Sequence, residues 1–302
     1  MTNPRPIEPD VPIRLLDLMP DGCQDLPSCR KMAAGIARRL GGRFIGRDRP
    51  EEGQLVVAAI DTTEIDLDGL LARMRTVYKG NALREIRKCR ELGYSTHRFQ
   101  RADHVPDIHE INTSKEARSG GAMKESYLRS IEELGGFPKA RAKVAPIECP
   151  MHHDTWWGIF QEEPGRRQGD ITVDEKLIGY IDLRRVGDLA IYSLIIGHGD
   201  YLRQGVMQQL HIDVMEWVLE SDSAEVKGIR HLMYAGWYQG GDGLRRWKKK
   251  MGFEPCYLVI DGAQRDRLLE EEPARSMIER IGRSTMARVP RSSRIWRRIC
   301  GR

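Results

Sequence analysis

A glycine-bearing turn between an apolar run and a long amphipathic stretch is the first place where this sequence could bind an anion. The segment Ile196-Gly197-His198-Gly199-Asp200 ends the apolar run, and the amphipathic stretch covers 203–220. Such a turn leaves backbone N–H groups unpaired at the positive end of the helix dipole, where a pyrophosphate or another anion can bind. We predict that a donor molecule is bound and lined by Tyr201, Arg203, Gln204, Gly205, Val206 and Trp237.

Proton transfer in the same region requires side chains that can accept or donate a proton. Asp182 and Ser193 lie on neighbouring predicted strands, where either could take a proton from an amine directly or through water. Tyr238 and Lys248 belong to a block at 231–255 that is rich in aromatic, glycine and lysine residues. We therefore predict these four residues as the catalytic group.

The cysteines and histidines predict no metal site. The six cysteines are scattered, with no CxxC and no Cys/His cluster at zinc-ligand spacing. They are Cys23, Cys29, Cys89, Cys149, Cys256 and Cys300. His109 and the pair His152-His153 could act as bases or ligands, but no carboxylate or cysteine stands at supporting spacing, so we predict structural roles for them.

The composition is that of an ordinary soluble protein, neither disordered nor fibrous. Apolar residues make up 40% of its 302 residues and charged residues 31%. The longest apolar run, Leu55 to Ile60, is far shorter than the roughly 20 residues of a membrane-spanning helix. The first residues lack the pattern of a secretory signal, so we expect reduced thiols and a cytoplasmic location.

Hydrophobic periodicity predicts the elements that would position these side chains. Before residue 94 we expect a helix at 27–40, a strand at 54–60, and two helices between 66 and 92 that are separated at Gly80-Asn81. After it we expect strands at 94–99, 154–161, 176–184, 189–197, 229–235 and 256–260, and helices at 105–113, 124–134, 203–220 and 243–251. The order is strand, helix, helix, three strands, helix, strand, helix, strand.

This order resembles the GNAT (Gcn5-related acyltransferase) fold, which implies an α/β protein whose mixed sheet is flanked by helices. The resemblance covers residues 94–262; residues 1–93 would form a smaller N-terminal α/β lobe or a degenerate GNAT half, and residues 263–302 a helix and a basic tail. In this family the turn before the long helix holds the pyrophosphate of coenzyme A with the pattern Gln/Arg-x-x-Gly-x-Gly/Ala. Gly205 matches the first glycine, whereas Leu202 and Met207 replace the flanking positions, and Lys248 stands where a general-acid tyrosine is common.

Two further segments resemble aminoacyltransferase branches of the fold. The pattern Leu232-x-Tyr234-x-Gly236-Trp237-Tyr238-x-x-Gly241, followed by Lys248 and Gly252-Phe253-x-Pro255, is similar to arginyl- and leucyl-tRNA protein transferases, although their N-terminal cysteine cluster is not matched. The segment 79–94, with Arg84, Arg87, Lys88 and Arg90, resembles a cationic element of Fem-type peptidoglycan aminoacyltransferases. These enzymes take an aminoacyl group from tRNA.

The charge is concentrated at the C-terminal end. Residues 281–302 hold seven arginines and no acid, and since the whole chain carries +5, the other 280 residues sum to −2. This tail, together with the Arg84–Arg90 segment, could contact tRNA or an anionic surface, or the tail could be a solubilising end.

The sequence thus predicts a GNAT-fold acyltransferase that moves an acyl group to an amine on a small molecule or a protein. No tightly bound cofactor is expected. The leading donor is acyl-CoA as co-substrate, and the alternative is aminoacyl-tRNA with a protein or peptide amine as acceptor. A third reading is a non-catalytic GNAT-like module that binds RNA or a partner.

Overall fold

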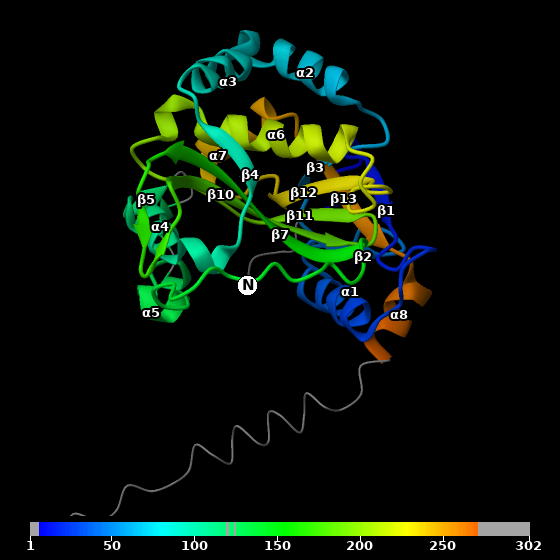
Figure 1. Ribbon diagram of the computed structural model, residues 1–302. Helices are drawn as coiled ribbons and strands as arrows, with labels where there is room; N and C mark the ends of the chain where they lie inside the picture. The colour runs from blue at the N-terminus through cyan, green and yellow to red at the C-terminus, as the bar shows by residue number, and fades with distance from the viewer. Residues whose placement is uncertain (1–5, 119–120, 124, 271–302) are drawn as a thin grey trace, which may run out of the picture.

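The computed structural model describes residues 6–118, 121–123 and 125–270, and over these residues the chain is a mixed α/β protein built on one large sheet (Figure 1). In the described residues this sheet has nine strands. Its order is β1 (Ile13–Leu16), β13 (Glu254–Ile260), β3 (Val57–Asp61), β12 (His231–Gly236), β11 (Leu189–Gly197), β10 (Glu175–Val186), β7 (His152–Glu162) and β4 (Ser95–Arg98), with β2 (Ile45–Arg47) also paired to β13. Two small ribbons lie outside it: β5 (Ala117–Arg118) with β6 (Gly121–Ala122), and β8 (Arg167–Gln168) with β9 (Ile171–Thr172).

Helices cover both faces of the sheet (Figure 1). On one face, side chains of α2 (Leu67–Thr76), α3 (Asn81–Glu91), α6 (Val206–Glu220) and α7 (Gly241–Lys250) pack into one apolar cluster with the strands. On the other face, α1 (Pro27–Arg39) and α8 (Gly262–Glu270) pack at one end, and α4 (Val105–Thr113) and α5 (Ile131–Leu134) at the other. Short 3₁₀ turns occur at η1 (Val77–Gly80), η2 (Arg101–His104), η3 (Glu125–Tyr127) and η4 (Leu202–Gln204).

Local sequence explains where several helices begin. Proline stands in the first turn of α1, and Arg38 and Arg39 stand in its last turn, where positive charge is favoured. Asp66 caps α2 by accepting a hydrogen bond from the Gly69 amide at 2.7 Å.

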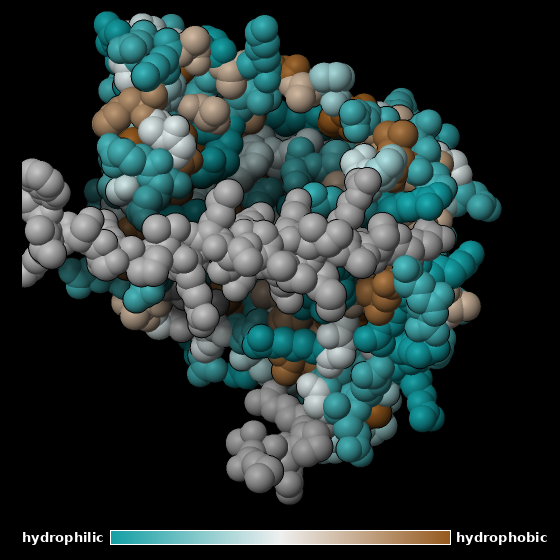
Figure 2. All heavy atoms as spheres, turned by 90° about the horizontal axis from the view of Figure 1, so that it is seen from below, coloured by the Kyte–Doolittle hydropathy of each residue, from teal (hydrophilic) through white to brown (hydrophobic). Residues whose placement is uncertain are grey.

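From below, the surface is mostly hydrophilic with small, scattered groups of hydrophobic residues, as is usual for a water-exposed protein face (Figure 2).

The predicted order of major elements from residue 94 to 260 is confirmed, and so is the fold class. One helix prediction is wrong: instead of a single helix over 124–134, the described residues form η3 and the short α5. The reason is a capping box, in which the Ser130 hydroxyl accepts from the Glu133 amide while the Glu133 carboxylate accepts from the Ser130 amide. A new helix therefore starts inside the predicted one.

The first 93 residues contribute to the same sheet as the rest. β3 lies between β12 and β13, and β1 and β2 both pair with β13 in parallel. The predicted boundary at residue 93 thus falls within a continuous sheet, and a separate N-terminal lobe stays a prediction. Of the predicted C-terminal helix and basic tail, α8 is observed, while residues 271–302 lie outside the described residues.

The centre of the sheet opens between β11 and β12. These strands are parallel and pair only over Leu189–Ile191 with His231–Met233. Beyond this point β11 continues to Gly197 alongside β10, whereas β12 stays paired with β3 alone, with a register shift between Met233 and Gly236. The two strands therefore diverge toward the end of the sheet from which η4 and α6 start.

Candidate functional site

A cavity of about 560 Å³ lies where β11 and β12 diverge. The end of β11, the start of α6, the end of β12, α7 and the segment around β5 all contribute to its wall. The lining residues are Lys115, Ala117, Arg118, Met123, Tyr127, Ile195, Ile196, Gly197, Leu202, Met207, Gln208, Tyr234, Gly243, Leu244 and Trp247. The mixture of apolar walls and a few polar groups is typical of a site for a small ligand or for one end of a larger one.

Two paired glycines allow α6 to pack closely against the strands at this cavity. Gly179 of β10 lies opposite Gly197 of β11, and a Cβ at either position would be within 2.8 Å of the Met207 sulfur. Met207 therefore fills the space that side chains at these positions would take. It stands where the coenzyme A pattern has glycine or alanine, and its bulk narrows the cavity beside the start of α6.

The predicted glycine turn is present before α6, but another helix covers it. Gly205 adopts a left-handed conformation with φ +82°, and a Cβ there would be 2.7 Å from the carbonyl oxygen of Glu85 on α3. The Glu85 carboxylate accepts a hydrogen bond from Gln208 Nε2 in the first turn of α6 at 2.8 Å and pairs with Lys250 Nζ at 3.4 Å. A carboxylate of the protein itself thus lies beside the first turn of α6, near the positive end of its dipole.

A partly buried cation borders the cavity at the end of β11. The Arg118 guanidinium donates to the carbonyl oxygens of Gly197 and Ile111, each at 2.8 Å. Burial lowers the pKa of Arg118, and its Nε has no hydrogen-bond partner among the described residues. Lys115, which is exposed, lines the same cavity. This wall is suited to an anionic or carbonyl-bearing ligand.

An aromatic group forms the wall on the side of β12 and α7. Tyr234 packs edge-on against Trp247 at 5.7 Å between ring centroids and lies 6.1 Å from Phe253. Burial raises the pKa of Tyr234, so its hydroxyl stays protonated at neutral pH. A protonated phenol at a cavity wall can donate a hydrogen bond to a carbonyl or to a leaving oxygen.

Lys248 is buried under this wall and does not line the cavity. Its Nζ donates to the carbonyl oxygens of Gly236 at 2.5 Å and Gln239 at 3.0 Å, and it lies 5.6 Å from the Tyr234 ring centroid. Burial lowers its pKa to about 8. These contacts hold the turn between β12 and α7, so the position favours a structural role beside Tyr234 over the predicted role in proton transfer.

The other three residues predicted as catalytic are not brought together. Tyr238 is 43% exposed and donates to Glu8 at 3.0 Å, outside the cavity. Asp182 shares a face of β10 with Tyr180, whose ring packs under α4. Ser193 is the extra residue of a bulge, because Leu183 pairs with Tyr192 and Asp182 with Leu194.

The residues predicted to bind the donor surround the turn but mostly serve the fold. The Tyr201 hydroxyl donates to Gln161 at 2.8 Å, and Gln204 accepts from the Tyr94 hydroxyl. Val206 is fully buried, and the Trp237 amide donates to the Val56 carbonyl at 2.7 Å. Arg203 is exposed at the turn, where it remains available to a phosphate.

Sequence reasoning missed both the cavity residues and a group of sulfur ligands. Tyr234 belongs to a transferase-like motif but was given no role, Trp247 lies only within the block 231–255, and Lys115 and Arg118 belong to no motif. At the other end of the central strands, Cys23, Cys29, Cys149 and His152 converge, with their potential ligand atoms within 4.8 Å of one another. The three-residue spacing of Cys149 and His152 was the available signal.

No protein-family model and no curated protein sequence matches the chain. Among solved structures it is similar to FemX, with 9% identity, a TM-score of 0.45, and coverage of 72% of this chain and 62% of that one. It is also similar to the C-terminal domain (DUF2156) of a putative lysylphosphatidylglycerol synthetase from Agrobacterium fabrum, with 16% identity, a TM-score of 0.35, and coverage of 67% and 58%. The chain thus spans less than two thirds of either structure's length. Among the described residues, no helix has both the length and the apolar character to cross a membrane.

Proposed function

We propose that this protein is an aminoacyltransferase that moves an aminoacyl group from tRNA to an amine acceptor held in the cavity between β11 and β12. The observation that carries this proposal is the position of Glu85. In an acyl-CoA enzyme of this fold the donor's pyrophosphate would bind at the start of the long helix, whereas here α3 packs on Gly205 and the Glu85 carboxylate bonds to Gln208. A pyrophosphate at the same place would meet a negative charge and a backbone oxygen.

The outer surface of α3 supports a nucleic-acid donor. Four basic residues are exposed along this helix: Arg84, Arg87, Lys88 and Arg90. Of these, Arg90 pairs with Asp213 at 2.9 Å and with Glu216 at 3.8 Å. Lysine and arginine on one helix face are the usual means of neutralising backbone phosphates. The predicted contribution of the arginine-rich tail lies outside the described residues and stays a prediction.

The cavity offers groups for the transfer step. The acceptor nitrogen would attack the ester carbonyl carbon of the aminoacyl group; a C–N bond forms, the C–O bond to the ribose breaks, and the ribose oxygen leaves with a proton. The edge of β11 beyond Ile191 has no described pairing with β12, so its backbone N–H groups could polarise the carbonyl. The Tyr234 hydroxyl would donate its proton to the leaving oxygen, and the proton released by the amine would pass through water back to Tyr234.

Ligand-induced stabilisation distinguishes the donors. A ligand at 100 times its dissociation constant adds about 2.7 kcal/mol, which corresponds to a rise in Tm of roughly 5–10 °C for a domain of this size. We expect this rise with total aminoacyl-tRNA, a smaller one with uncharged tRNA, and none with coenzyme A or acetyl-coenzyme A. A rise with acetyl-coenzyme A alone would overturn the proposal and restore acyl-CoA as the donor.

Two phenylalanine variants test the site itself. Tyr234→Phe removes a hydroxyl at the cavity wall, and Tyr238→Phe removes the same group at the surface. The first is expected to lower the rate of aminoacyl transfer by about 10²-fold, the second by less than about twofold. The measurement is transfer of a labelled aminoacyl group from tRNA to added amines, with hydrolysis of the ester subtracted. Equal loss in both variants would contradict the assignment, and binding of charged tRNA without any transfer would favour the non-catalytic module.

A further inference from the structure

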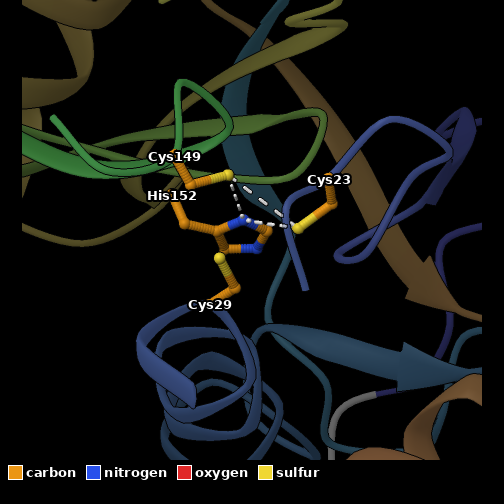
Figure 3. A group of neighbouring side chains, drawn as sticks. All are labelled: Cys23, Cys29, Cys149 and His152. Atoms are coloured by element: carbon orange, nitrogen blue, oxygen red, sulfur yellow. Dashed lines mark hydrogen bonds between the residues drawn. The ribbon is translucent and has the colours of Figure 1, made fainter. Parts of the chain in front are cut away.

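Three cysteines and a histidine from distant segments meet at one point of the fold (Figure 3). Cys23 lies in the segment between β1 and α1, and Cys29 in the first turn of α1. Cys149 precedes β7, and His152 is the first residue of that strand. Cys29, Cys149 and His152 are 0%, 1% and 6% exposed, and Cys23 is half-buried. Clusters of this composition in a protein interior are rare unless the groups share a ligand.

The separations of the ligand atoms match one tetrahedral ion. The Cys23 Sγ lies 3.9 Å from the Cys149 Sγ and 3.4 Å from the His152 Nδ1, and Cys149 Sγ to His152 Nδ1 is 3.7 Å. With Zn–S of about 2.3 Å and Zn–N of about 2.05 Å, a tetrahedron requires about 3.8 Å between sulfurs and about 3.6 Å between sulfur and nitrogen. All four atoms lie within 4.8 Å of one another, so closing the tetrahedron draws them in by about 1 Å at most.

The histidine is already oriented as a metal ligand. Its Nε2 lies 2.9 Å from the Leu18 carbonyl oxygen, which can only accept, so Nε2 carries the proton. The lone pair of the neutral ring is therefore on Nδ1, the nitrogen that faces the sulfurs. A hydrogen bond from the distal ring nitrogen to a carbonyl is the usual support of a metal-bound histidine.

A buried cation lies near this cluster. The Arg185 guanidinium is 1% exposed and donates to the Pro150 carbonyl, in the segment between Cys149 and His152, at 3.1 Å. The Asp25 amide donates to the Cys23 sulfur at 3.3 Å. Three thiolates, a neutral imidazole and a divalent ion would carry a net charge of −1, which the guanidinium offsets. All five cysteines of the described residues are free, and 3.9 Å is far beyond a disulfide bond of about 2.05 Å.

We propose that Cys23, Cys29, Cys149 and His152 bind one Zn²⁺ ion as a closed structural site. Its four protein ligands leave no position for substrate, as is usual for structural zinc. The ion would link the segment after β1 and the first turn of α1 to the start of β7, although these parts of the chain lie more than 100 residues apart in the sequence. Cys23 also lines a surface cavity of about 330 Å³, which provides access for the ion.

Metal analysis and cobalt substitution test this proposal independently of the transferase activity. The purified full chain is expected to contain one equivalent of zinc. After removal of zinc under reducing conditions, added Co²⁺ should give the intense visible bands of a tetrahedral site and thiolate-to-cobalt charge-transfer absorption. Cys149→Ser should lose most of the zinc and the charge-transfer intensity, whereas Cys89→Ser, a change at a buried cysteine outside the cluster, should retain one equivalent.

Three results would overturn the proposal. One is a reduced wild-type protein that shows no cobalt charge-transfer band; this readout needs no variant to fold. Another is a zinc content that is unchanged in Cys149→Ser. The last is a stoichiometric content of iron and sulfide, which would indicate a cluster in place of a single ion. None of these depends on whether the cavity between β11 and β12 binds tRNA.

Discussion

Replacing Asp182 by asparagine tests whether its carboxylate takes part in catalysis or only lowers the stability of the fold. Asp182 lies on β10, next to Trp156 of β7 and Leu194 of β11, and its Oδ1 has no hydrogen-bond partner among the described residues. Burial, reinforced by the nearby charge of Asp154, raises the pKa of Asp182 from 3.8 to about 6. At neutral pH the protein therefore holds a charge in a poorly solvated place.

The size and sign of the effect follow from the two pKa values. Between pH 3.8 and 6 the unfolded chain has lost the proton that the folded chain keeps, so the free energy of unfolding falls as pH rises through this window. The full difference of about 2.2 units corresponds to about 3 kcal/mol, and because Asp182 is partly exposed we expect about 2 kcal/mol. Asp182→Asn should therefore stabilise the protein by about 2 kcal/mol at pH 7.5, and by about 1 kcal/mol less at pH 5.

Urea unfolding at the two pH values, followed by tryptophan fluorescence, measures this difference. Asp154→Asn is the matched control, because Asp154 forms a bidentate pair with Arg184 at 2.6 and 2.9 Å and its loss should not stabilise the protein. A gain that is absent at pH 7.5, or equal at both pH values, would refute the reasoning. Since Asp182 does not line the cavity, the variant should keep its transfer rate within about twofold; a large loss would restore Asp182 as the general base.

Three other perturbations probe the packing around the site. Burial lowers the pKa of His211 from 6.5 to about 4. Because the unfolded chain binds a proton between these two values and the folded chain does not, the free energy of unfolding should fall by about 2 kcal/mol from pH 7 to pH 5. Urea titrations of a His211→Gln variant should lack this decrease. Lys248→Met leaves buried carbonyls without a donor and should cost about 3 kcal/mol, seen as a lower urea midpoint; a change below about 1 kcal/mol would contradict the assigned contacts. Gly205→Ala places a Cβ 2.7 Å from the Glu85 carbonyl oxygen at φ +82° and should lower stability by about 2–4 kcal/mol, whereas Gly93→Ala, also at positive φ but in open space, should cost about 1–2 kcal/mol.

Local patterns in the sequence were sufficient for most elements. The helix predicted at 27–40 is α1, and the strands predicted at 176–184 and 189–197 are β10 and β11. The strand–turn–helix pattern predicted a glycine turn before the long helix, and the structure shows Gly205 there in the left-handed conformation. Such features depend on residues within a few positions of one another, so their physical cause is visible in the sequence. The helix predicted over 124–134 is wrong because Ser130 caps a new helix at Ile131, and this cap interrupts the apolar periodicity of the segment.

The site depended on contacts that no local pattern contains. Glu85 reaches Gln208 across 123 residues of sequence, and the sulfurs of Cys23 and Cys149 meet across 126. The structure does not bring the four residues predicted as catalytic around one reacting centre. Ser193 lies in a bulge of β11, Tyr238 is exposed at the surface, and Lys248 bonds to backbone carbonyls. Asp182 does not line the cavity.

By itself, the sequence determined the order of strands and helices, the mixed α/β class and the glycine turn before α6, because backbone propensity and apolar spacing act over a few residues. Only the tertiary structure decided that a carboxylate covers this turn, that the cavity is lined by Arg118 and Tyr234, and that three cysteines and a histidine face one point. These arrangements follow from which strands pair and where helices pack, and that choice is made by the burial of the whole core rather than by any one segment.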